Sequence, residues 1–356
     1  MDPHLRVPFL LVILLLGSTG FVGQAFARAL RRRADPFIPL SRDAFDYTRF
    51  EFLLDYVRKT RPELVINAED DAGVGEFWSD GAIPNAGCRI QHSERRIDEG
   101  NSEPERLEML KANSLLPQTI ARVCGMTNTP WGHVSSGSIY AGAKLFEQGT
   151  FRVEEDLSSP AVRQLFAAHP ERFRGFTELD EPNFSFRHPP CTFYSGTKAL
   201  AEELVRNQSQ SYIWRVRLPF NEKDDPRNLL LRLQDDLRLC DAVNSLSHLD
   251  ECVSACLELW ERRGPFGIYN VVNPGAVSTH DILQMVQRIL KPSRRFEPII
   301  YESGPRAASL RTWPPDCILD VSKLLSTGVN LRDVRRALES SLRKWERQAS
   351  SLRNLA

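Results

Sequence analysis

The feature that most constrains the fold is an unbroken apolar run that leads directly into a glycine-patterned turn. Residues 7–16 read VPFLLVILLL, and GSTGFVG follows at 17–23. A strand that is buried on both faces of a parallel sheet has this continuous apolar character. The run is too short to span a bilayer, and the turn and amphipathic helix that follow it distinguish it from a signal peptide. We therefore expect the first strand of a parallel α/β sheet close to the N-terminus.

The glycines of this turn are spaced for close approach to a phosphate. Gly17, Gly20 and Gly23 form the pattern GxxGxxG between the predicted strand and a helix that begins at Phe21. Glycine lets the backbone turn tightly, and the first N–H groups of a helix attract an anion. Strand, turn and helix together predict a dinucleotide-binding site. The expected cofactor contacts in this segment are Gly17, Thr19, Gly20, Phe21, Val22 and Gly23.

Strands and helices alternate through the first 220 residues. Further strands are predicted at 36–40, 63–67, 133–136 and 211–219, and helices at 21–33, 50–60, 106–124 and 193–207. Alternation at this spacing implies parallel βαβ units with helices on both faces of one sheet. The predicted fold class is therefore α/β, a Rossmann-type doubly wound parallel sheet with a smaller C-terminal substrate lobe.

The chain divides into two predicted parts. An NAD(P)-binding Rossmann domain is expected over 1–220, and a mixed α/β substrate-binding lobe over 221–356. This division also allows a strand from one lobe to pair in the sheet of the other. Two polar stretches, at about 70–104 and 143–190, are too long for simple connections and are predicted insertions. The second contains a short helical piece near 161–169.

Charge and cysteine content exclude several classes of protein. The 46 basic residues balance the 46 acidic ones, so no net field attracts nucleic acid or an anionic membrane. The seven cysteines include no CxxC pair, which fits free thiols in a reducing cytoplasm. Cys252 and Cys256 have only His248 as a nearby third ligand, so buried thiols are expected there and no metal site.

The end of the second predicted strand bears on the choice of dinucleotide. The segment LSRDAFD at 40–46 should contact the adenosine ribose. A carboxylate there would favour NAD, whereas Ser41 and Arg42 could accommodate a 2′-phosphate. We therefore expect NADP(H) to be favoured over NAD(H), with the adjacent Asp43 as the alternative if the register shifts by one residue. Asp46 is a candidate partner for the adenine amino group, or else a solvated surface carboxylate.

Three side chains form the predicted reaction centre. In YSGTK, Tyr194 and Lys198 lie one helical turn apart on one face, and Ser136 ends a predicted strand, where open α/β sheets bind ligands. A tyrosine with a pKa near 10 exchanges protons poorly at pH 7, and a nearby ammonium together with the nicotinamide cation lowers that value. Lys198 would also bind the nicotinamide ribose. Ser136 would bond the substrate oxygen, while Tyr194 delivers or removes its proton as hydride moves at the same carbon.

Several motifs together resemble a known family. GSTGFVG, VINA at 65–68, VSSGSIYAG, YSGTK and RLPFN resemble the extended short-chain dehydrogenases/reductases that act on nucleotide sugars, over most of residues 8–330. FTELDEPNF, FYSGTKALAEEL, DPRNLL, NSLSHLDE and IYNVVNPGAVSTHDIL are similar to the 3,5-epimerase/4-reductases of UDP-rhamnose synthesis and, more distantly, to dTDP-4-dehydrorhamnose reductase. The resemblance implies that Asn67 and Ala68 line the cofactor, that Asn113 lies near the reaction centre, and that Pro219 packs by the nicotinamide. It also implies a nucleotide-sugar substrate and permits a homodimer.

The chain departs from this family at the positions that serve epimerisation. In the bifunctional enzymes a cysteine before the third helix and a lysine after the PRN segment are thought to move protons at C3 and C5 of the sugar. Ser102 and Arg232 occupy those places here. A serine hydroxyl and a permanently charged guanidinium are poor replacements for an acid/base pair, so we expect reduction without epimerisation unless Cys88 or His92 takes over.

A second departure separates the chain from the 4,6-dehydratases. Those enzymes need an Asp-Glu pair directly after the strand-end hydroxyl, and Gly137 and Ser138 stand there. Dehydration is therefore not expected. Two further residues are candidates for the substrate. Asn221 would contact the sugar or nucleotide, and Arg227 would bind diphosphate in a bidentate manner, or else form an exposed ion pair with Asp224 or Asp225.

Two other functions compete with reduction. A nucleotide-sugar 4-epimerase would return the same hydride to the opposite face of the sugar. A non-catalytic NADP-binding protein like the regulatory subunit of methionine adenosyltransferase would share the fold, and residues 305–324 loosely resemble a segment of both families. The complete set of Ser136, Tyr194 and Lys198 favours an NAD(P)-dependent oxidoreductase.

Overall fold

The structure is a computed structural model that describes residues 12–70, 102–235, 241–291 and 315–353. Cys88 and His92, the proposed substitutes for an epimerase pair, lie outside the described residues.

A six-stranded, entirely parallel sheet forms the centre of the molecule, in the order β12-β8-β4-β3-β1-β2. Its strands are β1 (Ile13–Leu16), β2 (Phe37–Leu40), β3 (Leu64–Asn67), β4 (Trp131–Ser136), β8 (Ser211–Val216) and β12 (Gly267–Asn270). In β1, Leu14 and Leu16 face one core cluster while Ile13 and Leu15 face the other. Burial on both sides explains the apolar character of 13–16, whereas 7–11 of the predicted strand lie outside the described residues. The sheet confirms the predicted doubly wound parallel fold.

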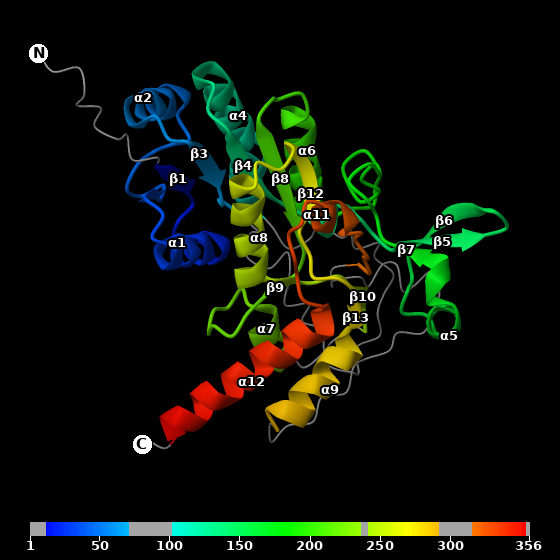
Figure 1. Cartoon of the computed structure of the whole chain (residues 1–356). Coiled ribbons are helices and arrows are strands. Elements are labelled where there is room, and N and C mark those ends of the chain that lie inside the picture. The colour runs from blue at the N-terminus through cyan, green and yellow to red at the C-terminus, as the bar shows by residue number, and fades with distance from the viewer. Residues whose placement is uncertain (1–11, 71–101, 236–240, 292–314, 354–356) are drawn as a thin grey trace, which may run out of the picture.

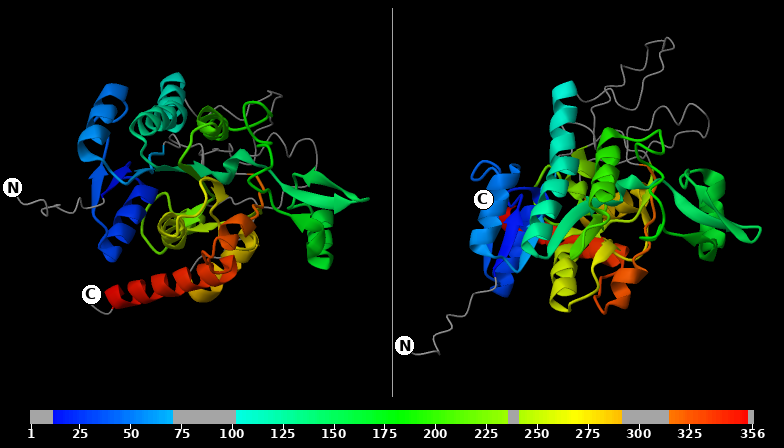
Figure 2. Two further views of the ribbon diagram at one scale, coloured as in Figure 1. Left: turned by 45° about the horizontal axis from the view of Figure 1, so that its top comes forward. Right: turned by 90° about the horizontal axis from the view of Figure 1, so that it is seen from above.

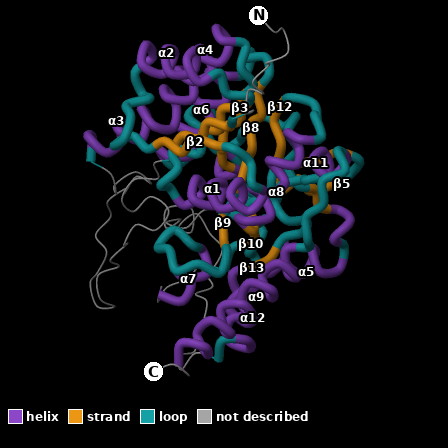
Figure 3. The backbone as a smooth tube through the Cα atoms, turned by 60° about the vertical axis from the view of Figure 1, so that its left-hand side comes forward, coloured by secondary structure: helices purple, strands orange, loops and turns teal. Residues whose placement is uncertain are grey.

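Helices cover both faces of this sheet (Figures 2 and 3). On one face α1 (Phe21–Arg33) packs against α8 (Leu249–Glu261). On the other face α2 (Phe50–Thr60), α4 (Leu116–Thr127) and α6 (Phe193–Val205) lie side by side. The carboxyl ends of β1, β3 and β4 therefore meet the N-terminal ends of α1 and α6 at one edge of the sheet.

The second predicted insertion builds a small unit of its own, which projects from the body in Figure 1. Strands β5 (Ala143–Glu147), β6 (Thr150–Glu154) and β7 (Phe173–Arg174) form an antiparallel sheet beside α5 (Pro160–Ala168). A core of Ala143, Leu145, Leu157 and Phe173 holds it together. The short helix expected near 161–169 is confirmed by α5.

The C-terminal part contributes to two regions. Helix α8 and β12 belong to the main sheet and its cover, whereas α9 (Thr279–Ile289) and α12 (Val334–Arg353) pack together in a separate cluster (Figure 1). The remaining elements are short: α3 (Glu103–Leu110), α7 (Leu229–Asp235), α11 (Ser322–Ser326), β9 (Pro219–Phe220), β10 (Val243–Asn244), β11 (Ser247–His248) and β13 (Val277–Ser278). The division of the chain at residue 220 stays a prediction.

Among the described residues, no helix is long and apolar enough to cross a membrane, and no three His, Cys, Asp or Glu side chains are grouped as metal ligands.

Candidate active site

The glycine turn between β1 and α1 has the close packing that its sequence predicts. Gly17 has φ +73°, and a Cβ there would lie 2.6 Å from the backbone nitrogen of Glu69. A Cβ on Gly23 would overlap the carbonyl oxygen of Gly17, so α1 reaches the turn only because position 23 has no side chain. Gly20 is the N-cap of α1, and Phe21 and Val22 are buried in its first turn. Thr19 is exposed beside them. The turn thus presents the N-terminus of α1 to an anion.

A buried phenol ties this turn to the strands beside it. The hydroxyl of Tyr47 donates to Oε2 of Glu69 at 2.5 Å and accepts from the backbone N–H of Gly17 at 3.1 Å. Nε of Arg42 lies 2.8 Å from Oε1 of the same carboxylate. Burial, followed by the hydrogen bond to Glu69, raises the pKa of Tyr47. Sequence reasoning missed Tyr47 and Glu69, because only the fold brings the segments after β2 and β3 together.

The two residues predicted to contact the adenosine part of the cofactor, Arg42 and Asp46, lie after β2. Asp46 is exposed, and its carboxylate turns back to accept from the backbone N–H and hydroxyl of Thr48 at 3.2 and 2.5 Å. Arg42 is exposed, and its Nε pairs with Oε1 of Glu69, so its guanidinium lies at the surface beside the glycine turn.

Two predicted residues at the end of β3 are fully enclosed. Nδ2 of Asn67 lies 3.0 Å from Nδ1 of His133, and its Oδ1 accepts from the backbone N–H of Glu69 at 3.1 Å. The backbone N–H of Ala68 donates to the carbonyl of Leu16 at 3.0 Å, which extends the β1–β3 pairing by one bond. Burial, together with the charge of Lys198, holds the pKa of His133 well below its usual range, so this imidazole is neutral.

Helix α6 carries the two central residues of the predicted reaction centre. Its N-cap Thr192 accepts from the backbone N–H of Ser195 at 3.0 Å, and α6 packs against β4 and the turn Gly137–Ile139. Tyr194 and Lys198 are 5% and 1% exposed, and Nζ of Lys198 lies 5.6 Å from the centre of the Tyr194 ring. The helical spacing thus brings both side chains to the same side of α6, as expected from YSGTK.

Ser136 lies at the end of β4, beside this helix. It is 6% exposed, and its hydroxyl lies 2.8 Å from that of Ser138, whose backbone N–H also donates to it at 3.2 Å. In the sequence, Ser138 bears only on the absence of the Asp-Glu pair that dehydration requires. The pair gives this strand end two adjacent hydroxyl groups.

A widened helical turn brings Asn113 against α6. The helix expected at 106–124 is interrupted by a π-helical turn at Lys111–Leu115, a feature often found at functional sites. Nδ2 of Asn113 donates to Oγ1 of Thr197 at 3.2 Å, and Oγ of Ser114 donates to the carbonyl of Thr197 at 2.7 Å. The π-helical turn therefore fixes the part of α6 that lies between Tyr194 and Lys198.

An acidic residue at the end of β3, which sequence reasoning missed, joins the two side chains on α6. Oδ1 of Asp70 lies 2.7 Å from Nζ of Lys198, and the hydroxyl of Tyr194 is 3.3 Å from the same oxygen. The sequence signal was weak, because Asp70 lies at the start of a long polar stretch in which carboxylates are common.

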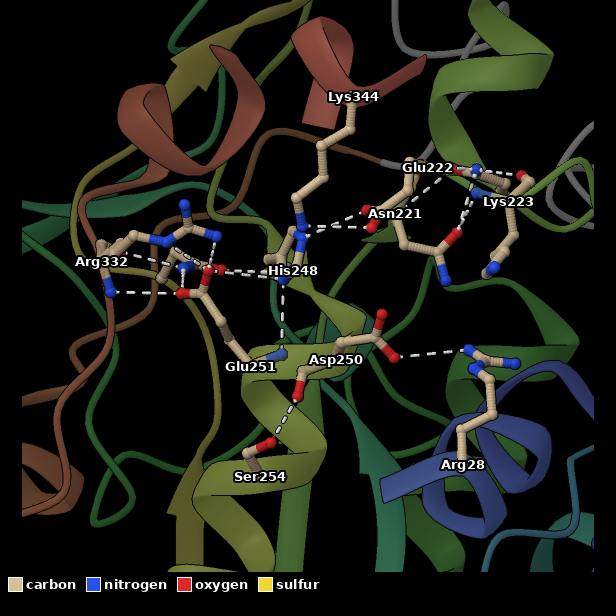
Figure 4. Close-up of polar contacts among 12 residues, drawn as sticks. Arg28, Asn221, Glu222, Lys223, His248, Asp250, Glu251, Ser254, Arg332 and Lys344 are labelled. Atoms are coloured by element: carbon tan, nitrogen blue, oxygen red, sulfur yellow. Dashed lines mark hydrogen bonds and ion pairs between the residues drawn. The ribbon is translucent and has the colours of Figure 1, made fainter. Parts of the chain in front are cut away.

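Pro219 is the first residue of β9, and the two predicted substrate residues, Asn221 and Arg227, lie on the segment that follows this strand. Asn221 is fully buried, its Oδ1 accepts from the backbone N–H of Lys223 at 2.9 Å, and its Nδ2 has no hydrogen-bond partner among the described residues (Figure 4). Arg227 instead forms a bidentate pair with Asp225, at 2.9 Å for both bonds, and its guanidinium lies 5.7 Å from the Phe21 ring centre. The ion pair considered as an alternative for Arg227 is therefore the one present.

Ion pairs anchor this segment to the C-terminal helix (Figure 4). Oε1 of Glu222 lies 3.2 Å from Nζ of Lys344 on α12, and its Oε2 faces Nε2 of the buried His248 at 3.8 Å. These neighbours lower the pKa of Glu222 to about 2, with His248 as the largest cause. At the N-terminus of α8, Glu251 pairs with Arg332, which precedes α12.

The two positions that depart from the epimerases lie on α3 and α7. Ser102 caps α3, and its backbone N–H and hydroxyl donate to Glu105 at 2.7 and 2.9 Å in a capping box. Arg232 lies half-buried on α7, where burial lowers its pKa to about 10. It therefore stays a cation at neutral pH and is unsuited to accept a proton.

The parallel sheet, the glycine turn and the placement of Tyr194 and Lys198 on α6 are the features that the sequence resemblance to extended short-chain dehydrogenases/reductases predicts. Parts of the chain are similar in sequence to plant nucleotide-sugar epimerase/reductases.

Comparison with known proteins finds similar sequences over part of the chain and similar folds over nearly all of it. No family model matches the chain. A bifunctional dTDP-4-dehydrorhamnose 3,5-epimerase/dTDP-4-dehydrorhamnose reductase of Arabidopsis thaliana is 38% identical over 120 residues, which are 33% of this chain and 38% of that protein. This chain therefore spans well under half of that plant relative, and a trifunctional Arabidopsis enzyme is matched over only 32% of its length.

Solved structures match over nearly the whole chain. The crystal structure of the L780 UDP-rhamnose synthase of Acanthamoeba polyphaga mimivirus has a TM-score of 0.70 at 20% identity, covering 94% of this chain and 99% of that one. A dTDP-4-dehydrorhamnose reductase of Clostridium acetobutylicum has a TM-score of 0.66 at 16% identity, covering 93% and 98%. At these identities the likeness concerns the fold.

Proposed function

We propose that the chain reduces the 4-keto group of a nucleotide-linked deoxysugar with NADP(H) as the reductant. The observation that carries the proposal is the joint placement of Tyr194 and Lys198 on α6, which packs against β4, the strand that ends at Ser136. The names of the relatives, which include dTDP-4-dehydrorhamnose reductase and UDP-rhamnose synthase, support the substrate class.

Each residue has a defined part in this reaction. Ser136 donates a hydrogen bond to the carbonyl oxygen of the sugar, and Tyr194 transfers its phenolic proton to that oxygen as the carbon is reduced. The bound nicotinamide supplies the hydride, that is, both electrons and one hydrogen. Lys198 stabilises the resulting phenolate and holds the nicotinamide ribose, after which Tyr194 regains a proton from solvent. Asn113 keeps α6 in position through Thr197.

The glycine turn fits a dinucleotide, because Cβ atoms at Gly17 and Gly23 would collide with backbone atoms that a phosphate-binding turn keeps close. The residues proposed to hold the cofactor are those of 17–23 together with Arg42, Asp46, Asn67, Ala68, Asn113, Tyr194, Lys198 and Pro219. Asn221 is proposed to contact the substrate through its unpartnered Nδ2. Arg227 is the weaker candidate, since Asp225 already engages it.

The decisive experiment combines the purified protein with NADPH and UDP- or dTDP-4-keto-6-deoxy sugars, in both stereochemical series. Stoichiometric NADPH consumption with a 4-hydroxy product supports the reductase. A change of stereochemistry at C4 without net NADPH consumption would instead identify the 4-epimerase. Tight NADPH binding without turnover on any keto sugar would favour the regulatory protein.

Arg42 should determine the preference for NADPH. We expect Arg42→Ala to weaken NADPH binding about tenfold or more, because it removes charge-assisted bonds to the 2′-phosphate, and to change NADH binding little. Titration of both dinucleotides by nucleotide fluorescence measures the effect. Arg49→Ala, which removes an exposed arginine stacked on Phe52, is the matched control. Equal losses for NADPH and NADH in Arg42→Ala would contradict this role.

Epimerisation should be absent from the wild-type protein. Incubation with the keto sugar in deuterium oxide, without NADPH, is expected to give no deuterium at C3 or C5, because Ser102 and Arg232 cannot act as an acid/base pair. Mass spectrometry of the recovered sugar measures the exchange. Deuterium exchange that appears only in the double variant Ser102→Cys with Arg232→Lys would show that these two positions carry the missing acid/base pair. Exchange in the wild type would contradict the expected absence of epimerisation.

A further inference from the structure

Asp70 makes contacts that set it apart from the other carboxylates near the sheet edge. Its Oδ1 pairs with Nζ of Lys198 at 2.7 Å, and the hydroxyl of Tyr194 donates to its two oxygens at 3.3 and 3.5 Å. Lys198 and Tyr194 are almost fully buried, whereas the Asp70 side chain is 38% exposed. One carboxylate therefore connects both groups with the surface of the molecule.

Among the described residues, the charged groups that face Tyr194 come from three elements. Lys198 on α6 and Arg217, which follows β8 and is buried, are cations that favour the phenolate. His133 on β4 is neutral. Asp70, after β3, is the anion in contact, and it accepts a hydrogen bond that only the protonated phenol can donate. It therefore opposes the two cations and favours the acid form of Tyr194.

We propose that Asp70 is a positioning residue that holds Lys198 in place and keeps Tyr194 in the protonated form that keto reduction consumes. The inference rests on the proposed function, because a net keto reduction begins with the phenol as the proton donor. An ammonium has three donors, so the pair with Asp70 leaves two for the ribose hydroxyls of a bound dinucleotide. The buried charge of Lys198 also gains the compensation that a buried cation needs.

The test is the pH dependence of reduction in Asp70→Asn. We expect the alkaline limb of kcat/KM to move to lower pH by about one unit, because removal of an anion about 3 Å away stabilises the phenolate. Asp70→Glu should restore most of the wild-type profile. Asp55→Asn, which removes the same charge from an exposed pair with Lys59, should leave the profile unchanged. Identical profiles in the wild type and Asp70→Asn would overturn the proposal.

A second measurement does not depend on turnover. The ultraviolet absorbance of phenolate is followed with pH in the wild type and in Asp70→Asn, and each is corrected with the corresponding Tyr194→Phe protein. Burial raises the pKa of Tyr212 to about 12 and also raises the pKa values of Tyr47, Tyr140 and Tyr269, so these phenols ionise late. The Tyr194 phenol should ionise at lower pH in Asp70→Asn.

The outcomes of the two measurements separate the two proposals. If no keto sugar is reduced but the phenol titration shifts as expected, the proposed function fails and the influence of Asp70 on Tyr194 stands. If reduction occurs but neither the titration nor the rate profile responds to Asp70→Asn, the function stands and the role of Asp70 is refuted. Circular dichroism of each variant verifies that it is folded.

Discussion

Replacement of Tyr194 by Phe is expected to lower kcat for keto-sugar reduction by about 10²- to 10⁴-fold, which is the contribution typical of a positioned general acid. The ring is 5% exposed and Phe keeps its shape, so the packing of α6 should survive. NADPH affinity should fall far less than kcat, because Lys198 and the glycine turn are untouched and only the Tyr194 hydroxyl is lost from the cofactor contacts. Stopped or continuous absorbance assays of NADPH give the rate, and nucleotide fluorescence gives the affinity.

The control for this variant removes a hydroxyl elsewhere. Tyr56→Phe alters a half-buried ring on α2 that packs against Phe45, away from α6, and it should reduce the sugar at the wild-type rate. If Tyr194→Phe and the wild type turn over equally fast, the mechanism proposed for Tyr194 is wrong.

The second large effect concerns the stability of the helix that carries the reaction centre. Glu202 on α6 lies 2.6 Å from Nη2 of Arg215 and accepts from the hydroxyl of Ser135 at 2.6 Å, all in the buried layer beneath the site. Glu202→Ala would leave the Arg215 cation buried without its carboxylate. We expect it to lower the free energy of unfolding by about 3–5 kcal/mol, as measured by urea denaturation.

The next residue on the helix is a matched control for that variant. Glu203 pairs with Arg187, whose side chain is 67% exposed, so Glu203→Ala should lower the free energy of unfolding far less than Glu202→Ala does. Comparable losses in the two variants would show that burial of the Arg215 pair does not determine its contribution.

The elements that the sequence predicted are those whose signal is local. The unbroken run of β1, the glycines at 17–23 and the four-residue spacing of Tyr194 and Lys198 depend on neighbours in the chain, and the structure places all of them as expected. The π-helical turn at 111–115 was missed because its residues continue a helical pattern on both sides. The small sheet at 143–174 was missed because its strands are short and lie within a polar stretch.

The site residues that the sequence did not predict depend on contacts between segments that are far apart in the chain. Asp70, Glu69 and Tyr47 acquire their partners only when the ends of β2 and β3 meet the glycine turn and α6. Nothing in the local sequence distinguishes these residues from other surface carboxylates and rings. For Arg227 the local sequence misleads. Its PRN motif predicts a contact to the substrate diphosphate, but its guanidinium pairs with Asp225, two residues earlier in the chain.

The position of β12 in the sheet has a consequence for how the chain must be synthesised and folded. β12 pairs along the outer side of β8, although residues 217–266 separate the two strands in the chain. Until the ribosome has released Asn270, the nascent nucleotide-binding sheet exposes the backbone of β8 as an open edge, which invites pairing with other chains. A fragment that ends at the predicted boundary near residue 220 would carry that edge permanently, and aggregation during expression should be its characteristic failure.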